Sequence, residues 1–242
     1  MVIRIIIEGG ALPDKNSTAD AGTVNTYDGS EVLREELKKF FIKVLGISDI
    51  SIIVTYEGSN KNAAKVFVSQ PDEDYLYTDL DDVPEKRAGW FTKMENDGIA
   101  IPEERRNDVF FWIQEMEAWF LKQPQCIEAW AAVRRIEIKT PIASDPLIAG
   151  KDIEHLTHKP SEVMKVIFRR DLKNTKKGKD GKPQKLVYGK LRVAPRLIPY
   201  LNPQELRKQD AELQLFVDSV NKKVEETKEI KECSEYNFGL KK

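Results

Sequence analysis

The chain has few cysteines and lacks two kinds of segment that would direct it to or through a membrane. Its two cysteines, Cys126 and Cys233, lie far apart and show no metal-type spacing. No run of 18 or more apolar residues is present, although a membrane-spanning helix needs one. The opening MVIRIIIEGG has neither the length nor the small-residue cleavage site of a signal peptide. These absences predict a reduced, cytoplasmic protein.

The chain also lacks a phosphate-binding loop of the pattern G-x-x-x-x-G-K-[ST], so any dependence on ATP has to come from another protein. Its formal net charge is only -1, which by itself says little about partners. The apolar and charged fractions, 40% and 33%, are ordinary for a soluble globular protein. A length of 242 residues suffices for one large domain, or for one domain with an appended helical part.

The first half of the chain alternates strand and helix patterns. Short β-branched or aromatic runs predict strands at residues 2–7, 50–56, 75–78 and 109–113. Helical spacing of apolar residues predicts helices at 31–45, 60–68, 115–121 and 125–135. Ser30 is the expected N-cap of the first of these helices, and Gly46 its stop. This order predicts an α/β fold with a mostly parallel sheet flanked by helices, over residues 1–125.

The second half of the chain differs in character. Helical patterns begin at Pro160, cover residues 186–201, and continue from Pro203 to about residue 226. Residues 173–185 contain no aliphatic or aromatic side chain and are rich in lysine and glycine, which predicts a mobile basic loop. We therefore expect residues 126–242 to form a mainly helical extension.

The stretch YLYTDLDDVP, residues 75–84, ends a predicted buried strand on a group of like charges. Glu8 ends another predicted strand, and ligands of open α/β sheets bind beyond the carboxyl ends of the strands. If the two strands are neighbours, Glu8, Asp79 and Asp81 converge, and such a set of oxygens suits Mg²⁺ or Mn²⁺. The alternative is a solvated turn, which Asp82 before Val83-Pro84 also fits.

These motifs resemble the Toprim fold, the metal-binding domain of topoisomerases, primases and several nucleases. That pattern has a glutamate after the first strand and Asp-x-Asp after a later one. The more specific resemblance is to a prokaryotic Toprim-like family of unknown function, encoded beside ABC-type or AAA ATPases in phage-defence clusters. The elements that carry this resemblance are IEGG, the segment 58–64, TDLDD, QEMEAWFL and the Y-x-K element at 188–190.

The resemblance implies roles for particular residues. Glu8, Asp79 and Asp81 become metal ligands, or Glu8 serves instead as a general acid or base. Glu117, in MEAWFL, becomes a candidate for a second metal or for orienting a water. Lys190 becomes a candidate for offsetting charge on a metal-bound phosphate. The alternatives are a surface carboxylate for Glu8 and, for Glu117, an ion pair on a helix face.

A basic segment lies between Lys165 and Arg196, where twelve Lys or Arg residues stand against Asp171 and Asp180 alone. Such a density attracts polyanions and makes their binding salt-dependent. The candidate nucleic-acid contacts are Lys176, Lys177, Lys179, Lys182, Lys185 and Arg192. A solvated hairpin tip is the alternative interpretation. Trp112 and Trp119 are expected to be packing residues rather than base-stacking platforms.

The leading hypothesis is a magnesium-dependent Toprim-type nuclease, or nuclease-like effector, that acts on DNA or RNA with a separate ATPase partner in anti-phage defence. The resemblance carries the ATPase and defence parts of this hypothesis. A second hypothesis is a non-catalytic Toprim-like subunit that regulates an ATPase. A third is a metal-dependent phosphoesterase acting on small nucleotides, for which the basic segment would be irrelevant.

Overall fold

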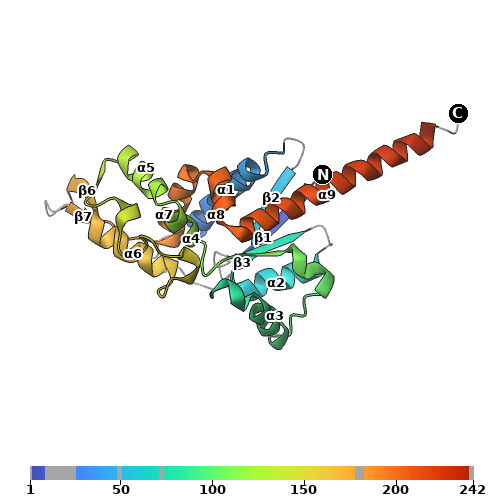
Figure 1. Ribbon diagram of the computed structural model, residues 1–242, viewed down its shortest axis with the longest axis horizontal. Helices are drawn as coiled ribbons and strands as arrows, with labels where there is room; N and C mark the ends of the chain where they lie inside the picture. The colour runs from blue at the N-terminus through green and yellow to red at the C-terminus, as the bar shows by residue number, and fades with distance from the viewer. Residues whose placement is uncertain (1, 9–25, 48–50, 71–73, 178–182, 240–242) are drawn as a thin grey trace.

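The computed structural model describes residues 2–8, 26–47, 51–70, 74–177 and 183–239 (Figure 1). The strands are β1 (Val2–Ile7), β2 (Ser51–Tyr56), β3 (Tyr75–Asp79), β4 (Val109–Trp112), β5 (Ile136–Ile138), β6 (Leu172–Lys177) and β7 (Pro183–Lys185). The helices are α1 (Thr26–Leu45), α2 (Asn60–Ser69), α3 (Arg87–Asn96), α4 (Ala118–Lys122), α5 (Gln125–Val133), α6 (Pro160–Asp171), α7 (Lys190–Leu197), α8 (Pro203–Gln209) and α9 (Ala211–Gly239).

The first four strands form one parallel sheet in the order β2-β1-β3-β4. The register sets Ile7 of β1 opposite Tyr77 of β3, so the residue after β1 lies beside Thr78. In the same way Asp79 lies opposite Trp112 at the end of β4. The predicted α/β fold with a parallel sheet flanked by helices is therefore confirmed, and β1 and β3 are neighbours as the metal hypothesis requires.

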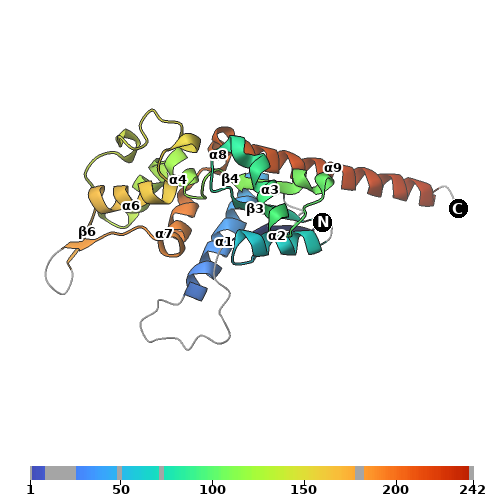
Figure 2. The ribbon, with the colours of Figure 1, turned by 90° about the horizontal axis from the view of Figure 1, so that it is seen from below.

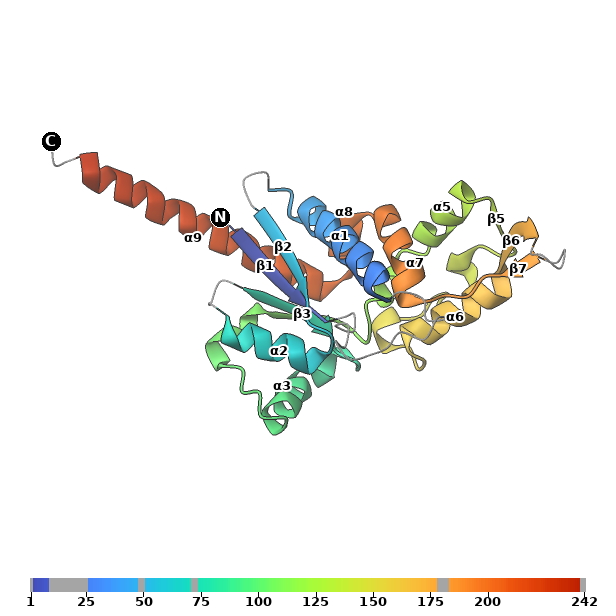
Figure 3. The ribbon, with the colours of Figure 1, turned by 180° about the vertical axis from the view of Figure 1, so that it is seen from behind.

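Helices cover both faces of this sheet, as Figure 3 shows from behind. Ile3, Ile5 and Ile7 point to the face covered by α1 and α9, where the larger core lies. Ile6 points to the opposite face, which α2 and α3 cover with a smaller core. This alternation is what a strand buried on both faces requires, and it explains the nearly continuous apolar run of β1.

The expected start of the first helix is wrong by several residues. Ser30 is not its N-cap, because α1 begins at Thr26 and Ser30 lies within it. Gly46 does end the helix: it has a φ of +64° and donates its backbone N–H to the carbonyl of Ile42. The helix continues on its N-terminal side through Gly29, where an added Cβ would lie 3.1 Å from both the Cβ and the carbonyl oxygen of Leu191. Glycine thus allows α1 to lie close to α7.

The helix expected from residue 115 begins later, at Ala118. Residues 114–117 instead form a turn, in which Ala118 and Trp119 donate their backbone N–H groups to the carbonyls of Glu115 and Met116. Gln114 has a φ of +58°, which an α-helix does not allow. The helix expected over residues 186–201 is likewise shorter, since α7 begins at Lys190 and ends at Leu197.

The C-terminal helices are present, and they pack on the sheet domain. One core of buried residues runs from β1, α1 and β3 through α5 and α6 to α7 and α9. The first part of α9 contacts β4, and its far end extends away from the body (Figures 1 and 2). None of the described helices is long and apolar enough to cross a membrane. A boundary at residue 125 stays a prediction, although the core is continuous across it.

Part of the basic loop predicted at residues 173–185 forms paired strands, which fits the alternative interpretation as a hairpin. Residues 172–177 and 183–185 form the antiparallel strands β6 and β7, with β5 on the other side of β6. The dipeptide Asp180-Gly181 is a hairpin-turn signal, but the flanking residues lack the alternating apolar pattern that makes that signal strong. Residues 178–182 lie outside the described residues.

Candidate metal centre at the carboxyl ends of the strands

Glu8 lies directly after β1, at the edge of the sheet where β3 also ends. The hydroxyl of Thr78, which is fully buried on β3, donates to Glu8 Oε2 at 2.6 Å. Because the two strands are parallel neighbours, their ends bring Glu8 and Asp79 to the same side of the sheet. The first part of the sequence prediction, that the two strand ends meet, is therefore confirmed.

Asp79 is the last residue of β3 and is only 5% exposed. Its Oδ1 accepts the backbone N–H of Met116 at 2.9 Å, so the turn after β4 holds the carboxylate in place. Its Oδ2 accepts from Lys190 Nζ at 2.7 Å. The ammonium of Lys190, which is predicted to lie near a phosphate, thus pairs with Asp79.

Glu117 reaches the same cluster from the turn before α4 and is 1% exposed. The Tyr188 hydroxyl donates to Glu117 Oε1 at 2.9 Å. The other oxygen, Oε2, is buried without a hydrogen-bond partner and lies 4.0 Å from Lys190 Nζ. A buried carboxylate oxygen without a donor is energetically costly, so its position beside the ammonium marks a place for positive charge.

The pKa values of these groups follow from burial and from crowding of like charges. Burial and, to a smaller extent, the nearby Asp79 carboxylate together raise the pKa of Glu8 to about 7. Burial also raises the pKa values of Asp79 and Glu117, and Lys190 opposes both shifts. The pKa of Lys190 is raised, because the attraction of Asp79 and Glu117 outweighs its own burial. The ammonium stays charged while three carboxylates compete for it.

Asp81 lies at the exposed rim of this cluster. Its side chain is 43% exposed, and its Oδ1 accepts from Lys159 Nζ at 2.8 Å. Asp81 has a φ of +61° and donates its backbone N–H to the carbonyl of Gln114, the other left-handed residue of the two adjoining turns. Such strained residues persist only where their surroundings hold them, and they gather at functional sites. Gln114 is held by its side-chain amide, which donates to the carbonyls of Glu154 and Leu156.

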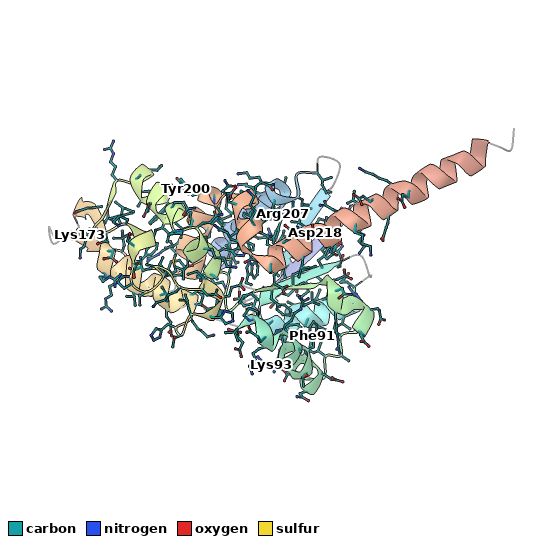
Figure 4. All side chains as sticks on the ribbon, in the orientation of Figure 1. Phe91, Lys93, Lys173, Tyr200, Arg207 and Asp218 are labelled. Carbon is teal, nitrogen blue, oxygen red and sulfur yellow. The ribbon has the colours of Figure 1, made fainter. Side chains whose placement is uncertain are left out.

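Four of the six predicted nucleic-acid contacts lie on described elements, three of them on the strands β6 and β7 and one on α7. Lys176 and Lys177 are on β6, Lys185 is on β7, and Lys179 and Lys182 lie outside the described residues. Arg192 is exposed on α7 and donates to the carbonyl of Val187 at 2.8 Å. In Figure 4 Lys173 of β6 lies at the end of the molecule opposite the free end of α9. Trp112 and Trp119 are buried, as expected of packing residues.

Comparisons with models of protein families, with curated proteins and with solved structures give no match. The Toprim resemblance therefore stays a prediction, and the site is interpreted from its own geometry. Among the residues that the structure describes, no three His, Cys, Asp or Glu side chains are grouped so that they could hold a metal ion as they stand. The ammonium of Lys190 lies among the carboxylates instead.

Sequence reasoning missed two residues of this site. The Y-x-K element does not predict the contact of Tyr188 with Glu117, which spans 71 residues of sequence. The sequence gives no sign of the contact of Lys159 with Asp81, which spans 78 residues. Neither contact follows from spacing along a strand or helix, because each joins an element of the first half to one of the second. The only available signal was the position of Tyr188, two residues before Lys190.

Proposed function

We propose that the protein is a magnesium- or manganese-dependent nuclease, or a nuclease-like effector, that hydrolyses phosphodiesters of DNA or RNA. The observation that carries the proposal is the convergence of Glu8, Asp79 and Glu117 on the ammonium of Lys190 at the carboxyl ends of parallel strands. Buried groups with perturbed pKa values that meet at such an edge are typical of active sites.

The residues fit a hard divalent cation. Their donors are carboxylate oxygens, which Mg²⁺ and Mn²⁺ prefer, and Glu117 Oε2 has no hydrogen-bond donor of its own. Glu8 and Asp79 would hold the ion, with either Asp81 or Glu117 as a further ligand. When bound, such an ion polarises the phosphoryl oxygens and activates water. Its charge would also offset the repulsion among the carboxylates.

The side chains of this chain supply proton transfer and charge. Without a bound metal, burial raises the pKa of Glu8 to about 7. If Glu8 serves as a general acid or base instead of holding the ion, its carboxyl can therefore take and give a proton near neutral pH. Thr78 fixes Glu8 Oε2 and so orients the group. Lys190, held charged beside Asp79, supplies positive charge for a phosphate in the transition state.

The basic hairpin supports a nucleic-acid substrate. Strand β7 ends at Lys185, and three residues further on the chain reaches Tyr188, which contacts Glu117. A polyanion bound along β6 and β7 would therefore be continuous with the carboxylate site. Neutralising its phosphates with the lysines listed above would make binding weaken steeply with salt. The proposed partner, an ABC- or AAA-type ATPase, and a role in phage defence rest on the family resemblance alone.

The proposal is tested by incubating the purified protein with panels of DNA and RNA, with Mg²⁺ or Mn²⁺ or with a chelator. We expect metal-dependent cleavage that falls at least about a hundredfold in Glu8→Gln and Asp79→Asn, because each removes a group from the reacting centre. Asp97→Asn is the matched control, since Asp97 forms an ion pair with Lys61 at the surface. Cleavage that is unchanged in both site variants contradicts the assignment.

A second function, a non-catalytic subunit of an ATPase complex, is favoured by one observation. Lys190 already neutralises part of the carboxylate cluster, so part of the charge that a metal would offset is offset without one. Calorimetry separates the two functions: tight binding to an ATPase with no metal binding at millimolar Mn²⁺ would favour the subunit.

A further inference from the structure

The sequence offers two ways to complete the cation site, through Asp81 or through Glu117. Both residues belong to turns that follow neighbouring strands, β3 and β4. Their surroundings differ in burial, in existing partners and in what faces each carboxylate. These differences decide between the two, given the metal dependence of the proposed function.

Asp81 already has a cation. Lys159 Nζ lies 2.8 Å from its Oδ1, and Lys159 and Asp81 are both about half exposed to solvent. Lys159 also lies 3.8 Å from Glu115, whose Oε2 accepts the backbone N–H of Ser161 in the first turn of α6. Asp81 is thus part of a surface network that closes the turn against α6. Nothing in its contacts leaves an oxygen in need of a ligand.

Glu117 has the opposite surroundings. It is 1% exposed, and Tyr188 fixes one of its oxygens. The remaining oxygen, Oε2, is buried without a hydrogen bond and faces Lys190 Nζ at 4.0 Å, a distance too long for one. Asp79 Oδ2 faces the same ammonium at 2.7 Å. A single positive charge is therefore shared by two buried carboxylates, and it bonds only one of them.

We propose that the divalent cation binds between Asp79 Oδ2 and Glu117 Oε2, in the place that the Lys190 ammonium holds, and that Asp81 is not a ligand. The ion and the ammonium then exclude each other, because both need Asp79 Oδ2. Binding of the ion frees Lys190 for a substrate phosphate. Tyr188 acts as a positioning residue, since its hydroxyl holds Glu117 so that Oε2 faces the ion.

Calorimetric titration of Mn²⁺ into the full chain and its variants tests this arrangement. Glu117→Gln should weaken Mn²⁺ binding more than about tenfold, and Tyr188→Phe should weaken it by about tenfold, the usual scale for a group that orients a ligand. Asp81→Asn should change the affinity less than about threefold, because a partner of an exposed ion pair contributes little. Lys190→Met should bind Mn²⁺ more tightly than the wild type, since the competing ammonium is gone.

Folding of each variant is checked by circular dichroism and by its melting temperature without metal. If Glu117→Gln does not fold, Tyr188→Phe and Lys190→Met decide the question. A crystal of the wild-type protein soaked in Mn²⁺ needs no variant: the Lys190 to Asp79 contact should open, and the ion should contact Glu117. An ion bound by Asp81 while that contact stays closed overturns the inference.

The outcomes separate this inference from the proposed function. Metal-dependent cleavage together with Mn²⁺ binding that depends on Asp81 and not on Glu117 overturns the inference and keeps the nuclease. Binding that depends on Glu117 without cleavage of any nucleic acid supports the inference and contradicts the nuclease. If neither the wild type nor Lys190→Met binds Mn²⁺ at millimolar concentration, both are wrong.

Discussion

Two clusters of buried charge lie on either side of the turn and helix at residues 114–122, and each is built around one lysine. Lys122 bonds Glu154 at 2.6 Å and Asp210 at 2.8 Å, and its side chain is 7% exposed. Asp210 also accepts from Trp119 Nε1 and from the backbone N–H of Leu213, so it caps α9. Lys190, in contrast, bonds Asp79 at 2.7 Å and lies 4.0 Å from Glu117, and Glu8 adds a weaker electrostatic attraction.

The difference between the clusters is whether the carboxylate oxygens have hydrogen-bond donors. Around Lys122 the carboxylates have donors from the lysine, the indole or the backbone. Around Lys190 the ammonium bonds Asp79 and lies 4.0 Å from Glu117, whose Oε2 has no hydrogen bond. A cluster with donors for its carboxylates fastens elements together, here α4 to the turn before α9. A cluster with a buried oxygen that lacks a donor, at a sheet edge, leaves room for a ligand of positive charge.

The comparison predicts that replacing each lysine has a different cost in stability and a different response to metal. Lys122→Met leaves Glu154 and Asp210 without their cation, and we expect it to cost about 3–5 kcal/mol of unfolding free energy, as breaking a buried ion pair does. Lys190→Met should cost less, about 1–3 kcal/mol, because Asp79 and Glu117 have raised pKa values and can take up protons instead. Urea unfolding with a chelator, and then with Mn²⁺, measures both.

Mn²⁺ should restore stability to Lys190→Met and leave Lys122→Met unchanged. Lys61→Met is a control for lost surface charge, since Lys61 pairs with Asp97 at the surface. Rescue of Lys122→Met by Mn²⁺ would mean that the Lys122 cluster also binds metal. Equal losses without any rescue would mean that the two clusters have the same, purely structural role.

The pH dependence of stability sharpens the same contrast. Because the pKa of Glu8 in the folded protein is about 7, above the usual 4.5, the folded state binds more protons than the unfolded state between these values. The stability that the protonated carboxyl gives is complete below about pH 4.5 and is lost as the pH rises to about 7. Glu8→Gln should lack this loss, roughly 1–3 kcal/mol, in metal-free urea titrations from pH 4.5 to 7.5.

Asp79 and Glu117 also have raised pKa values, so their titration lowers stability as the pH rises, both in the wild type and in Glu8→Gln. The difference between wild type and Glu8→Gln therefore reports Glu8 together with its electrostatic interaction with Asp79. A difference that stays constant with pH would show that Glu8 is an ordinary surface carboxylate.

The sequence predicts local elements well and contacts between the halves of the chain poorly. The parallel order and the meeting of Glu8 with Asp79 follow from strand patterns and from the rule that ligands bind at carboxyl ends. The start of α1 was missed because Gly29, which resembles a loop residue, lies in the helix to let Leu191 approach. Tyr188 and Lys159 were missed because their contacts join distant elements, and no spacing along the chain encodes them.

The smallest effect concerns how α1 supports the Lys190 cluster. Alanine favours a helix over glycine by about 0.8–1.0 kcal/mol. Gly89→Ala in α3 should realise most of this gain, because nothing lies within 4 Å of an added Cβ there. Gly29→Ala should not, since its Cβ would lie 3.1 Å from the carbonyl oxygen of Leu191, the residue after Lys190. To relieve this contact α7 has to shift by a few tenths of an ångström, and Lys190 shifts with it.

We therefore expect Gly29→Ala to be no more stable than the wild type in urea unfolding and to change its Mn²⁺ affinity. Gly89→Ala should gain stability and bind Mn²⁺ like the wild type, because α3 contacts neither cluster. The Lys122 cluster should be unaffected by both substitutions, since neither glycine lies beside it. An equal gain in stability for both variants, with unchanged Mn²⁺ binding, would show that α7 is free to adjust and that the close approach of α1 does not position Lys190.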